Sequence, residues 1–331
     1  MRPHVLASCA VSLDGFLDDA TPQRRILSGP ADLDRVDEER SKVDAILVGA
    51  GTVRADDPRL LVRAPERRAA RTARGLPESP LRVVLTNSAL PDDARVRSGP
   101  AETITLTGTP GEVLDELGCR GVVRLMVEGG ASVLREFLTA GAVDELQLVL
   151  APQLVGEGPR FTGGGRAPHL VDTRTIGEDV LLRHRFGDAD DRHLAEACVL
   201  AENCPPSATA FSVGCVVVAD DGTVLGSGWS RRDHPLDHAE EGVLRALGND
   251  PRLRRATLYS SLEPCGARAS RPDPCAALIA RAGIPRVVHA WREPPEFVAA
   301  PSGTEQLEAV GTEVRHVPRW EPLARRCAAR L

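Results

Sequence analysis

The sequence is short of lysine and of positive charge overall. Lys42 is the only lysine among 331 residues, and the net charge is −6 with a pI of about 5.8. Proteins that bind nucleic acid gather positive charge on one face, whereas the arginines here are scattered. We therefore expect no nucleic-acid partner.

Long apolar runs are also missing. No stretch is long enough to span a bilayer, and residues 1–6 lead into a strand-like segment without a signal-peptide pattern. Eight cysteines in a chain of this length do not form a disulfide framework. We expect no membrane partner and a cytoplasmic location, where thiols stay reduced and can bind metal.

Repeats and low-complexity linkers are absent, and the length favours two domains over one. The polar stretch 187–192 separates the strand-like 180–186 from the helix-like 193–203. It predicts an N-terminal domain of residues 1–187 and a C-terminal domain of residues 192–331.

Both halves alternate apolar strands with helices, which predicts α/β domains whose sheets are covered on both faces. In the first half we expect strands at 5–11, 45–49, 82–85, 103–106, 122–127 and 146–150, and helices at 31–41, 111–117 and 131–139. In the second half we expect strands at 212–219, 224–229, 257–262, 286–290 and 314–317, a hairpin turn at 220–223, and helices at 239–247, 274–282 and 322–330.

The second half carries a candidate metal site. His238 offers an imidazole, and Cys265 and Cys275 offer two thiolates. Three such ligands with an open fourth position are typical of catalytic zinc, which lowers the pKa of a bound water to about 7. Glu240 follows His238 by two residues and is placed as the non-ligand proton carrier that zinc deaminases use.

The bland alternative is that these residues are unrelated. A His-Ala-Glu tripeptide occurs on many helices by chance, and a pair of cysteines more often packs in the hydrophobic core than binds a metal. The predicted elements around these residues favour a metal site. Cys265 closely follows the predicted strand 257–262, while Cys275 and His238 each stand at the start of a predicted helix. Helix N-termini favour thiolates, so we expect a catalytic zinc site rather than a structural one.

Glycines in the first half suggest a second site. Glu128-Gly129-Gly130 stands between a predicted strand and a predicted helix, where a phosphate could approach the backbone. Residues 49–52, which include two glycines, predict another turn. Residues 53–63 follow it and carry both aspartate and arginine side chains. The Rossmann fingerprint Gly-x-Gly-x-x-Gly is absent, and an ordinary turn and solvated loop remain the alternative.

Several of these segments form a specific set. It comprises Ser12–Gly15, Asp44–Val53, Asp56–Leu60, Val127–Gly130, Val143–Leu146 and Ala151–Gly156. With the zinc motif, the set resembles the bifunctional deaminase/reductase family of riboflavin biosynthesis along nearly the whole chain. The resemblance implies an N-terminal dihydrofolate-reductase-like domain that uses NADPH, a C-terminal cytidine-deaminase-like three-layer α/β/α domain that uses Zn²⁺, and a homodimer or larger homo-oligomer.

The resemblance also implies roles for individual residues. Thr52 and Asp56 would contact NADPH, Gly129 and Gly130 would seat its phosphate, and Arg40, Leu60, Arg63 and Glu128 would face a pyrimidine ribotide. We assign the substrate phosphate to Arg63, because a guanidinium matches it with two hydrogen bonds. Within 23–27, Ile26 stands where a bacterial relative can have a cofactor-facing Trp.

Two features depart from the bacterial pattern. The reductase half comes first here, and nine residues, 266–274, separate the two cysteines. That loop is more similar to the fungal PCSxRLSGxxPC pattern than to the bacterial PCSHxGRTPPC. Arg268 and Ser270 in the loop are candidates for phosphate contact. Because the fungal route reduces first and deaminates second, we expect this zinc site to prefer a ribityl substrate.

The sequence therefore predicts a two-step enzyme. NADPH would reduce the ribosyl chain of a 2,5-diamino-6-(5-phosphoribosylamino)pyrimidinone, and Glu240 would carry protons while the ring is hydrolytically deaminated. Two alternatives remain: a single-activity or specialised-metabolite enzyme on this scaffold, or a nucleic-acid-editing deaminase or zinc-stabilised binding module. Net acidity and the long loop between the cysteines weigh against editing, and the presence of Glu240 against a binding module.

Overall fold

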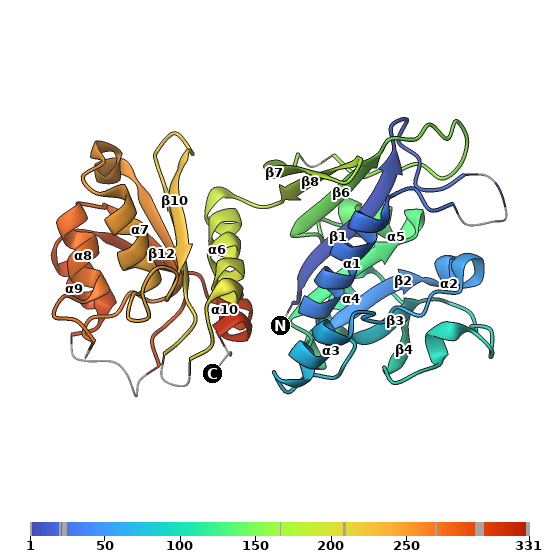
Figure 1. The fold of residues 1–331 in the computed structure, drawn as a ribbon, viewed down its shortest axis with the longest axis horizontal. Helices are drawn as coiled ribbons and strands as arrows, with labels where there is room; N and C mark the ends of the chain where they lie inside the picture. Colours follow the sequence, from blue (N-terminus) through green and yellow to red (C-terminus); the bar gives the residue numbers. More distant parts are fainter. Residues whose placement is uncertain are drawn as a thin grey trace. The chain divides into compact units, whose positions relative to one another are not determined.

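The computed structural model describes residues 2–19, 21, 25–165, 167–207, 210–268, 270–294 and 301–328. The chain divides into two compact units, Met1–Phe186 and Gly187–Leu331. Each unit has its own sheet with helices around it, which confirms the predicted α/β class (Figure 1). None of the described helices combines the length and apolar character needed to cross a membrane.

The first unit is built on an eight-stranded sheet in the order β4-β3-β2-β5-β1-β6-β8-β7. The six strands from β4 to β6 run parallel, and β8 and β7 continue the sheet antiparallel. The strands are β1 His4–Ser12, β2 Ala45–Gly49, β3 Leu81–Leu85, β4 Thr103–Leu106, β5 Arg124–Gly129, β6 Glu145–Ala151, β7 His169–Ile176 and β8 Asp179–Arg185.

Alternating side chains of this sheet enter two separate cores. On β2, Leu47 packs in one core with the helices α4 and α5, while Ile46 packs in the other with α2. A parallel sheet needs both faces covered, so nearly all of its central residues are apolar. The helices are α1 Pro30–Lys42, α2 Ala50–Asp56, α3 Pro65–Thr72, α4 Pro110–Cys119 and α5 Ala131–Thr139.

The second unit has a five-stranded sheet in the order β10-β9-β11-β12-β13. Helices α7, α8 and α9 cover one face, and α6 and α10 pack together on the other (Figure 1). The strands are β9 Gly214–Val218, β10 Val224–Trp229, β11 Thr257–Leu262, β12 Arg286–Trp291 and β13 Glu313–His316. The helices are α6 Ala189–Leu200, α7 Ala239–Leu247, α8 Cys275–Ala282, α9 Gly303–Ala309 and α10 Glu321–Ala328. The three layers agree with the prediction.

Some predicted elements were wrong. Residues 50–56 form helix α2 rather than a turn, because Ala50 and Val53 bury against the sheet and outweigh the local preference of the glycines. Helix α6 begins at Ala189 instead of 193, since Asp188 caps it by accepting a hydrogen bond from the backbone N–H of Asp191 at 2.9 Å. The sequence analysis missed α3, α9 and β7, and the predicted end of α10 at 329–330 lies outside the described residues.

Candidate active sites

The three proposed metal ligands come from three different elements of the second unit. His238 is the N-cap of α7, Cys265 follows the end of β11, and Cys275 is the first residue of α8. Proline before Cys275 favours a helix start there, because its fixed φ suits that position. Two helix starts and one strand end therefore meet at one point, as the element predictions imply.

The ligand atoms have the spacing of a tetrahedral zinc site. His238 Nδ1 lies 3.6 Å from Cys265 Sγ and 3.4 Å from Cys275 Sγ, and all three atoms lie within 4.8 Å of one another. Bond lengths of about 2.0–2.3 Å in a tetrahedron separate the ligands by about 3.5 Å. Hydrogen bonds from Cys275 and His238 hold the pKa of the Cys265 thiol well below its usual range, which favours the thiolate. The donor set and its geometry fit zinc.

Glu240 lies beside this ligand set without belonging to it. Its side chain is buried, and Oε1 accepts a hydrogen bond from Ser260 Oγ at 2.7 Å. Oε2 lies 3.5 Å from Cys275 Sγ, so one carboxylate oxygen is oriented by β11 while the other reaches the metal position. The sequence analysis did not include Ser260. No signal short of the strand pairing could have found it, because it lies 20 residues from Glu240.

A cavity of 450 Å³ opens over the ligand set. Apolar Phe211 and Leu236 line it together with His238, Glu240 and Cys265. More than half of the lining residues are polar or charged, so a flat heteroaromatic ring packed against Phe211 and Leu236 would find several hydrogen-bonding groups around it. The remaining lining residues are Ser207, Ala210, Val213, Ser230, Arg231, Pro235, Asp237, Leu262, Glu263, Ala267, Arg268, Ser270 and Glu293.

The loop between the cysteines is held onto α7 by ion pairs. Arg268 Nη1 donates to Glu241 at 2.9 Å, and its side chain is 5% exposed. Arg271 donates to Asp237 at 2.9 Å and lies 3.3 Å from Glu241. The guanidinium of Arg268 is thus already engaged in a structural contact, while Ser270 is an exposed part of the cavity lining. Ala269 lies outside the described residues.

Two adjoining cavities, of 660 and 650 Å³, lie in the first unit. The first is lined by all four predicted cofactor residues, Thr52, Asp56, Gly129 and Gly130. The second is lined by all four predicted substrate residues, Arg40, Leu60, Arg63 and Glu128. Residues shared by both cavities mark their junction: Cys9, Ala10, Ser28, Leu33, Asp56 and Glu128. The predicted residues thus form two groups that meet where a hydride donor and acceptor would have to meet.

The cofactor cavity is shaped by close contacts at glycines. A Cβ on Gly130 would lie 3.0 Å from Thr52 Oγ1, and one on Gly49 would lie 2.9 Å from Val133 Cγ2. Gly49 and Gly130 are the N-caps of α2 and α5, so both helix starts open at this cavity without side chains in the way. A dinucleotide phosphate fits such a place, because helix N-termini present unpaired N–H groups. The residues present therefore fit NADPH. Ile26 also lines this cavity and is 59% exposed, whereas Gln23 and Arg24 lie outside the described residues.

Arg40 and Glu128 form a bidentate ion pair at the substrate cavity. Arg40 Nε and Nη2 donate to the two carboxylate oxygens of Glu128, each at 2.6 Å. Burial disfavours the guanidinium charge, but Glu128 outweighs this and raises the pKa of Arg40. Arg40 and Glu128 therefore hold each other's charged groups in one orientation at the substrate cavity.

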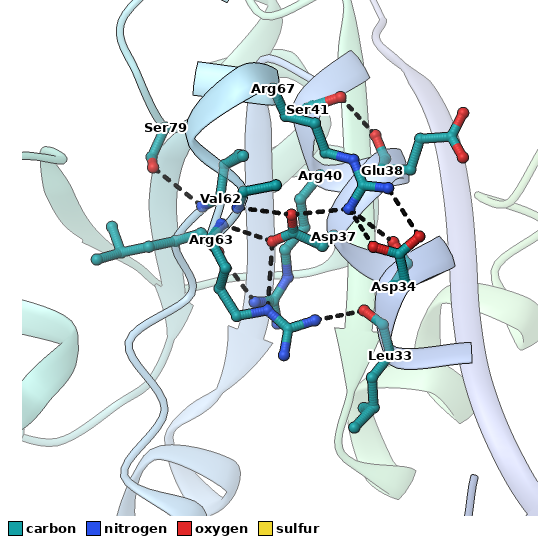
Figure 2. Close-up of polar contacts among 12 residues, drawn as sticks. Leu33, Asp34, Asp37, Glu38, Arg40, Ser41, Val62, Arg63, Arg67 and Ser79 are labelled. Atoms are coloured by element: carbon teal, nitrogen blue, oxygen red, sulfur yellow. Dashed lines mark hydrogen bonds and ion pairs between the residues drawn. The ribbon is translucent and has the colours of Figure 1, made fainter. Parts of the chain in front are cut away.

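Arg63 lines the same cavity with a side chain that is 56% exposed. Its Nε lies 3.3 Å from Asp37 Oδ1, and its Nη2 donates to the carbonyl oxygen of Leu33 (Figure 2). Asp37 and Ser28 are absent from the predicted site residues. Both belong to segments whose role becomes visible only once α1 is placed against residues 57–64.

Comparisons with known proteins agree with this two-part arrangement. Residues 3–182 match the family described as the RibD C-terminal domain, and residues 188–291 match the cytidine and deoxycytidylate deaminase zinc-binding region. These matches confirm the predicted domain order and fold types, a reductase of dihydrofolate-reductase type before a deaminase of cytidine-deaminase type. They also confirm Zn²⁺ and NADPH as the cofactors of the two domains.

Individual relatives cover one domain at a time. A 2,5-diamino-6-ribosylamino-4(3H)-pyrimidinone 5′-phosphate reductase from Archaeoglobus fulgidus is 36% identical over 212 residues, covering 56% of this chain and 92% of that protein. The riboflavin biosynthesis protein RibD from Mycobacterium tuberculosis is 39% identical over 155 residues, covering 46% of this chain but only 43% of that protein. The Rib2 deaminase from Aspergillus oryzae is 24% identical, covers 42% of this chain and 90% of that chain, and has a TM-score of 0.36.

Proposed function

The chain belongs to the family of the RibD C-terminal domain, and on that premise we propose that it catalyses both a reduction and a deamination in riboflavin biosynthesis. The substrate of the reductase is a 2,5-diamino-6-(5-phosphoribosylamino)pyrimidinone, and the zinc site deaminates the pyrimidine ring. The observation that carries the proposal is the presence, in one chain, of a complete His238–Cys265–Cys275 ligand set and two adjoining cavities in the other unit.

In the reductase unit, the protein's part is to bring two ligands together. NADPH, when bound, supplies the hydride for C1′ of the opened ribose. Gly129 and Gly130 leave room for its phosphate, and Thr52 and Asp56 line the rest of its cavity. The Arg40–Glu128 pair and Leu60 hold the pyrimidine next to the junction, and Arg63 binds the substrate phosphate. Orientation of this kind can supply a large part of the rate increase.

In the deaminase unit, His238, Cys265 and Cys275 would hold zinc, which when bound would lower the pKa of a water to about 7. Glu240 would accept one proton of the attacking water at Oε2 and pass it to a ring nitrogen, then carry the second proton, from the added hydroxyl, to the leaving amino group, while Ser260 holds Oε1 in place. The apolar walls at Phe211 and Leu236 hold the ring and exclude other water. Arg268 and Ser270 act at the phosphate end of the substrate, Ser270 directly and Arg268 by holding the loop through Glu241.

The order of the two steps is reduction first. The support is the loop of residues 266–274 between the cysteines, whose sequence is more similar to the fungal pattern. A flexible ribityl chain and a closed ribose ring present their hydroxyls differently to such a loop. The zinc site therefore prefers the ribitylamino compound, and the reductase accepts the substrate that still carries its amino group.

Assembly and location complete the proposal. All eight cysteines are free, which suits a reducing cytoplasm. The edge strand β7 has exposed Leu170 and Val171, at 56% and 41%, and its free edge can pair with a second copy. A homodimer or larger homo-oligomer is therefore proposed, and light scattering of the purified chain tests it.

The central experiment uses the diaminopyrimidine ribotide as substrate. The purified chain is incubated with it without cofactor, with NADPH and with NADH, and the products are identified by mass. NADPH should give the reduced and deaminated product, and omission of cofactor should leave the ribosyl chain unreduced. Unchanged ribotide in all three mixtures would contradict the proposal, and equal turnover with NADH would remove the preference for NADPH.

A further inference from the structure

A buried carboxylate, Asp37, accepts hydrogen bonds from Arg63, which lines the substrate cavity of the reductase unit (Figure 2). Asp37 is only 2% exposed, although it is charged and sits within helix α1. Burying a carboxylate is unfavourable unless donors compensate for the lost water. Oδ1 accepts hydrogen bonds from the backbone N–H of Arg63 at 2.6 Å and from Arg63 Nε at 3.3 Å, and Oδ2 accepts from the Ala64 N–H at 3.1 Å and from Arg67 Nη1 at 3.0 Å.

These bonds hold the segment of residues 57–64, which forms one wall of the substrate cavity. Residues 57–64 are neither helix nor strand, so no backbone ladder holds them. Leu60 has a left-handed φ of 52°, which is unfavourable for a residue with a Cβ and persists only where surrounding contacts impose it. Further bonds link the wall to other parts of the chain, among them Val62 N–H to Ser79 Oγ at 3.0 Å, Arg82 Nη1 to the Arg59 carbonyl at 3.2 Å, and Arg40 Nη1 to the Leu61 carbonyl at 3.2 Å.

Asp37 also sets the direction of the Arg63 side chain. Asp37 holds Nε, and the Leu33 carbonyl of the same helix holds Nη2. Within the part of the chain that the structure describes, Nη1 of Arg63 has no hydrogen-bond partner. A guanidinium anchored at two nitrogens and open at the third is preorganised for an anion, since its fork cannot rotate away.

The carboxylate keeps its charge in this setting. Burial by itself would raise the pKa of Asp37, but the hydrogen bonds from Arg63, Ala64 and Arg67 outweigh it, so the pKa lies below its ordinary value. Asp37 therefore acts as a permanent acceptor at neutral pH.

We propose that Asp37 is a positioning residue for the phosphate of the reductase substrate. It does not touch the ribotide, but it holds the Arg63 guanidinium and the wall around Leu60 in the orientation that receives it. This inference rests on the proposed function of the reductase cavity. Without the carboxylate, Arg63 keeps its charge but loses its direction, so binding of the phosphate weakens more than the hydride-transfer step.

The test compares Asp37→Asn with Asp34→Asn. Asp34 is a matched control, because it lies on the same helix and its side chain is 69% exposed; among the described residues its carboxylate binds Arg67, at 2.7 and 2.9 Å, and does not bind Arg63. KM and kcat are measured for NADPH-dependent reduction of the ribosylaminopyrimidine with and without its 5′-phosphate. Asp37→Asn should raise KM for the phosphorylated compound about tenfold or more, and change KM for the dephosphorylated compound and kcat by less than about threefold. Asp34→Asn should leave the ratio of the two KM values unchanged.

A double mutant shows whether the effect passes through Arg63. In an Arg63→Ala background, Asp37→Asn should have no further effect on the KM ratio. An undiminished effect there, or equal losses on both substrates with a lowered Tm, would overturn the inference and indicate a purely structural residue. If Asp37→Asn does not accumulate as folded protein, Asp37→Glu replaces it, because the longer side chain cannot keep the four donors in place, and the same loss of phosphate preference is expected. A wild-type chain that does not reduce the ribotide at all would overturn the proposed function, and this inference with it.

Discussion

In the deaminase unit, the three proposed metal ligands lie at the ends of helices and strands, whereas in the reductase unit Leu60 and Arg63 lie in a segment that is neither helix nor strand. His238 and Cys275 are placed by helix starts, which local sequence specifies. Leu60 and Arg63 are placed by Asp37, Ser79, Arg82 and Arg40, which lie in other parts of the chain. A site that depends on short motifs should fail completely when one ligand is lost, while a site held by many remote bonds should weaken in steps.

Cys265→Ala should give the largest effect, because it removes a thiolate ligand of the proposed zinc site. We expect zinc content to fall far below one per chain and deamination to become undetectable, while NADPH-dependent reduction continues. Elemental analysis and product analysis by mass measure the two. Cys119→Ala is the control, since Cys119 is exposed, belongs to the other unit and does not line the cavity. Full zinc occupancy in the Cys265 variant would contradict the ligand assignment.

Glu240→Gln should keep zinc and fold but lower kcat for deamination about 10²- to 10⁴-fold, because an amide cannot carry the proton. Reduction of the ribosyl substrate should persist. Glu241→Gln is the comparison: it is the next residue, but its carboxylate binds Arg268 of the substrate-binding loop, so its loss should raise KM and leave kcat for deamination near the wild-type value. Deamination near the wild-type rate in Glu240→Gln would exclude this residue as the proton carrier.

Ser260→Ala should lower kcat for deamination by about 30-fold, since a hydrogen bond to a charged group contributes about 1.5–3 kcal/mol. Ser260 Oγ donates to Glu240, whereas the neighbouring Ser261 Oγ accepts from the Gly214 N–H at 3.1 Å. Ser261→Ala therefore makes the same chemical change in the same strand without touching Glu240. Equal losses in the two variants would mean that strand packing, and not orientation of Glu240, is responsible.

The zinc site should deaminate the ribitylamino compound about tenfold faster than the ribosylamino compound, judged by kcat/KM. That ratio needs only about 1.4 kcal/mol of differential transition-state binding. The 266–274 loop is the feature that would distinguish the two. A clear preference for the ribosyl compound would place deamination before reduction.

Gly130→Ala should raise KM for NADPH about fivefold. The added Cβ would lie 3.0 Å from Thr52 Oγ1 and narrow the cofactor cavity, which should weaken cofactor binding by about 1 kcal/mol. Deamination of a supplied ribityl substrate should not change. Gly111→Ala in α4 is the control, since the added Cβ would lie 4.0 Å from Thr109 Oγ1, an ordinary contact distance. A KM for NADPH that matches wild type would show that this close contact does not shape the cofactor site.

Much of the fold followed from local patterns. The strands at 45–49, 103–106, 224–229 and 257–262 and the helices at 131–139 and 239–247 have the predicted bounds. Apolar runs of strand length between helices are enough for this, because burial on both faces leaves little choice of residue. Local patterns failed where burial overrode them, as in α2, or where the element is exposed, as in β7, which buries little apolar surface.

The residues proposed for the zinc site could be chosen from the sequence alone. Such residues can be recognised as one site even when they lie far apart in the sequence, because few residue types serve as zinc ligands. Here one imidazole and two thiolates each stood at the end of a predicted helix or strand, with a carboxylate nearby. The folded structure was needed to see which side chains hold the site residues in place and which site residues are already bonded to another side chain. Ser260 reaches Glu240, Arg268 turns to Glu241, and Asp37 holds Arg63 across 26 residues of chain. A hydrogen-bonding side chain can serve many partners, so its role is set by what the fold brings within about 3 Å of it.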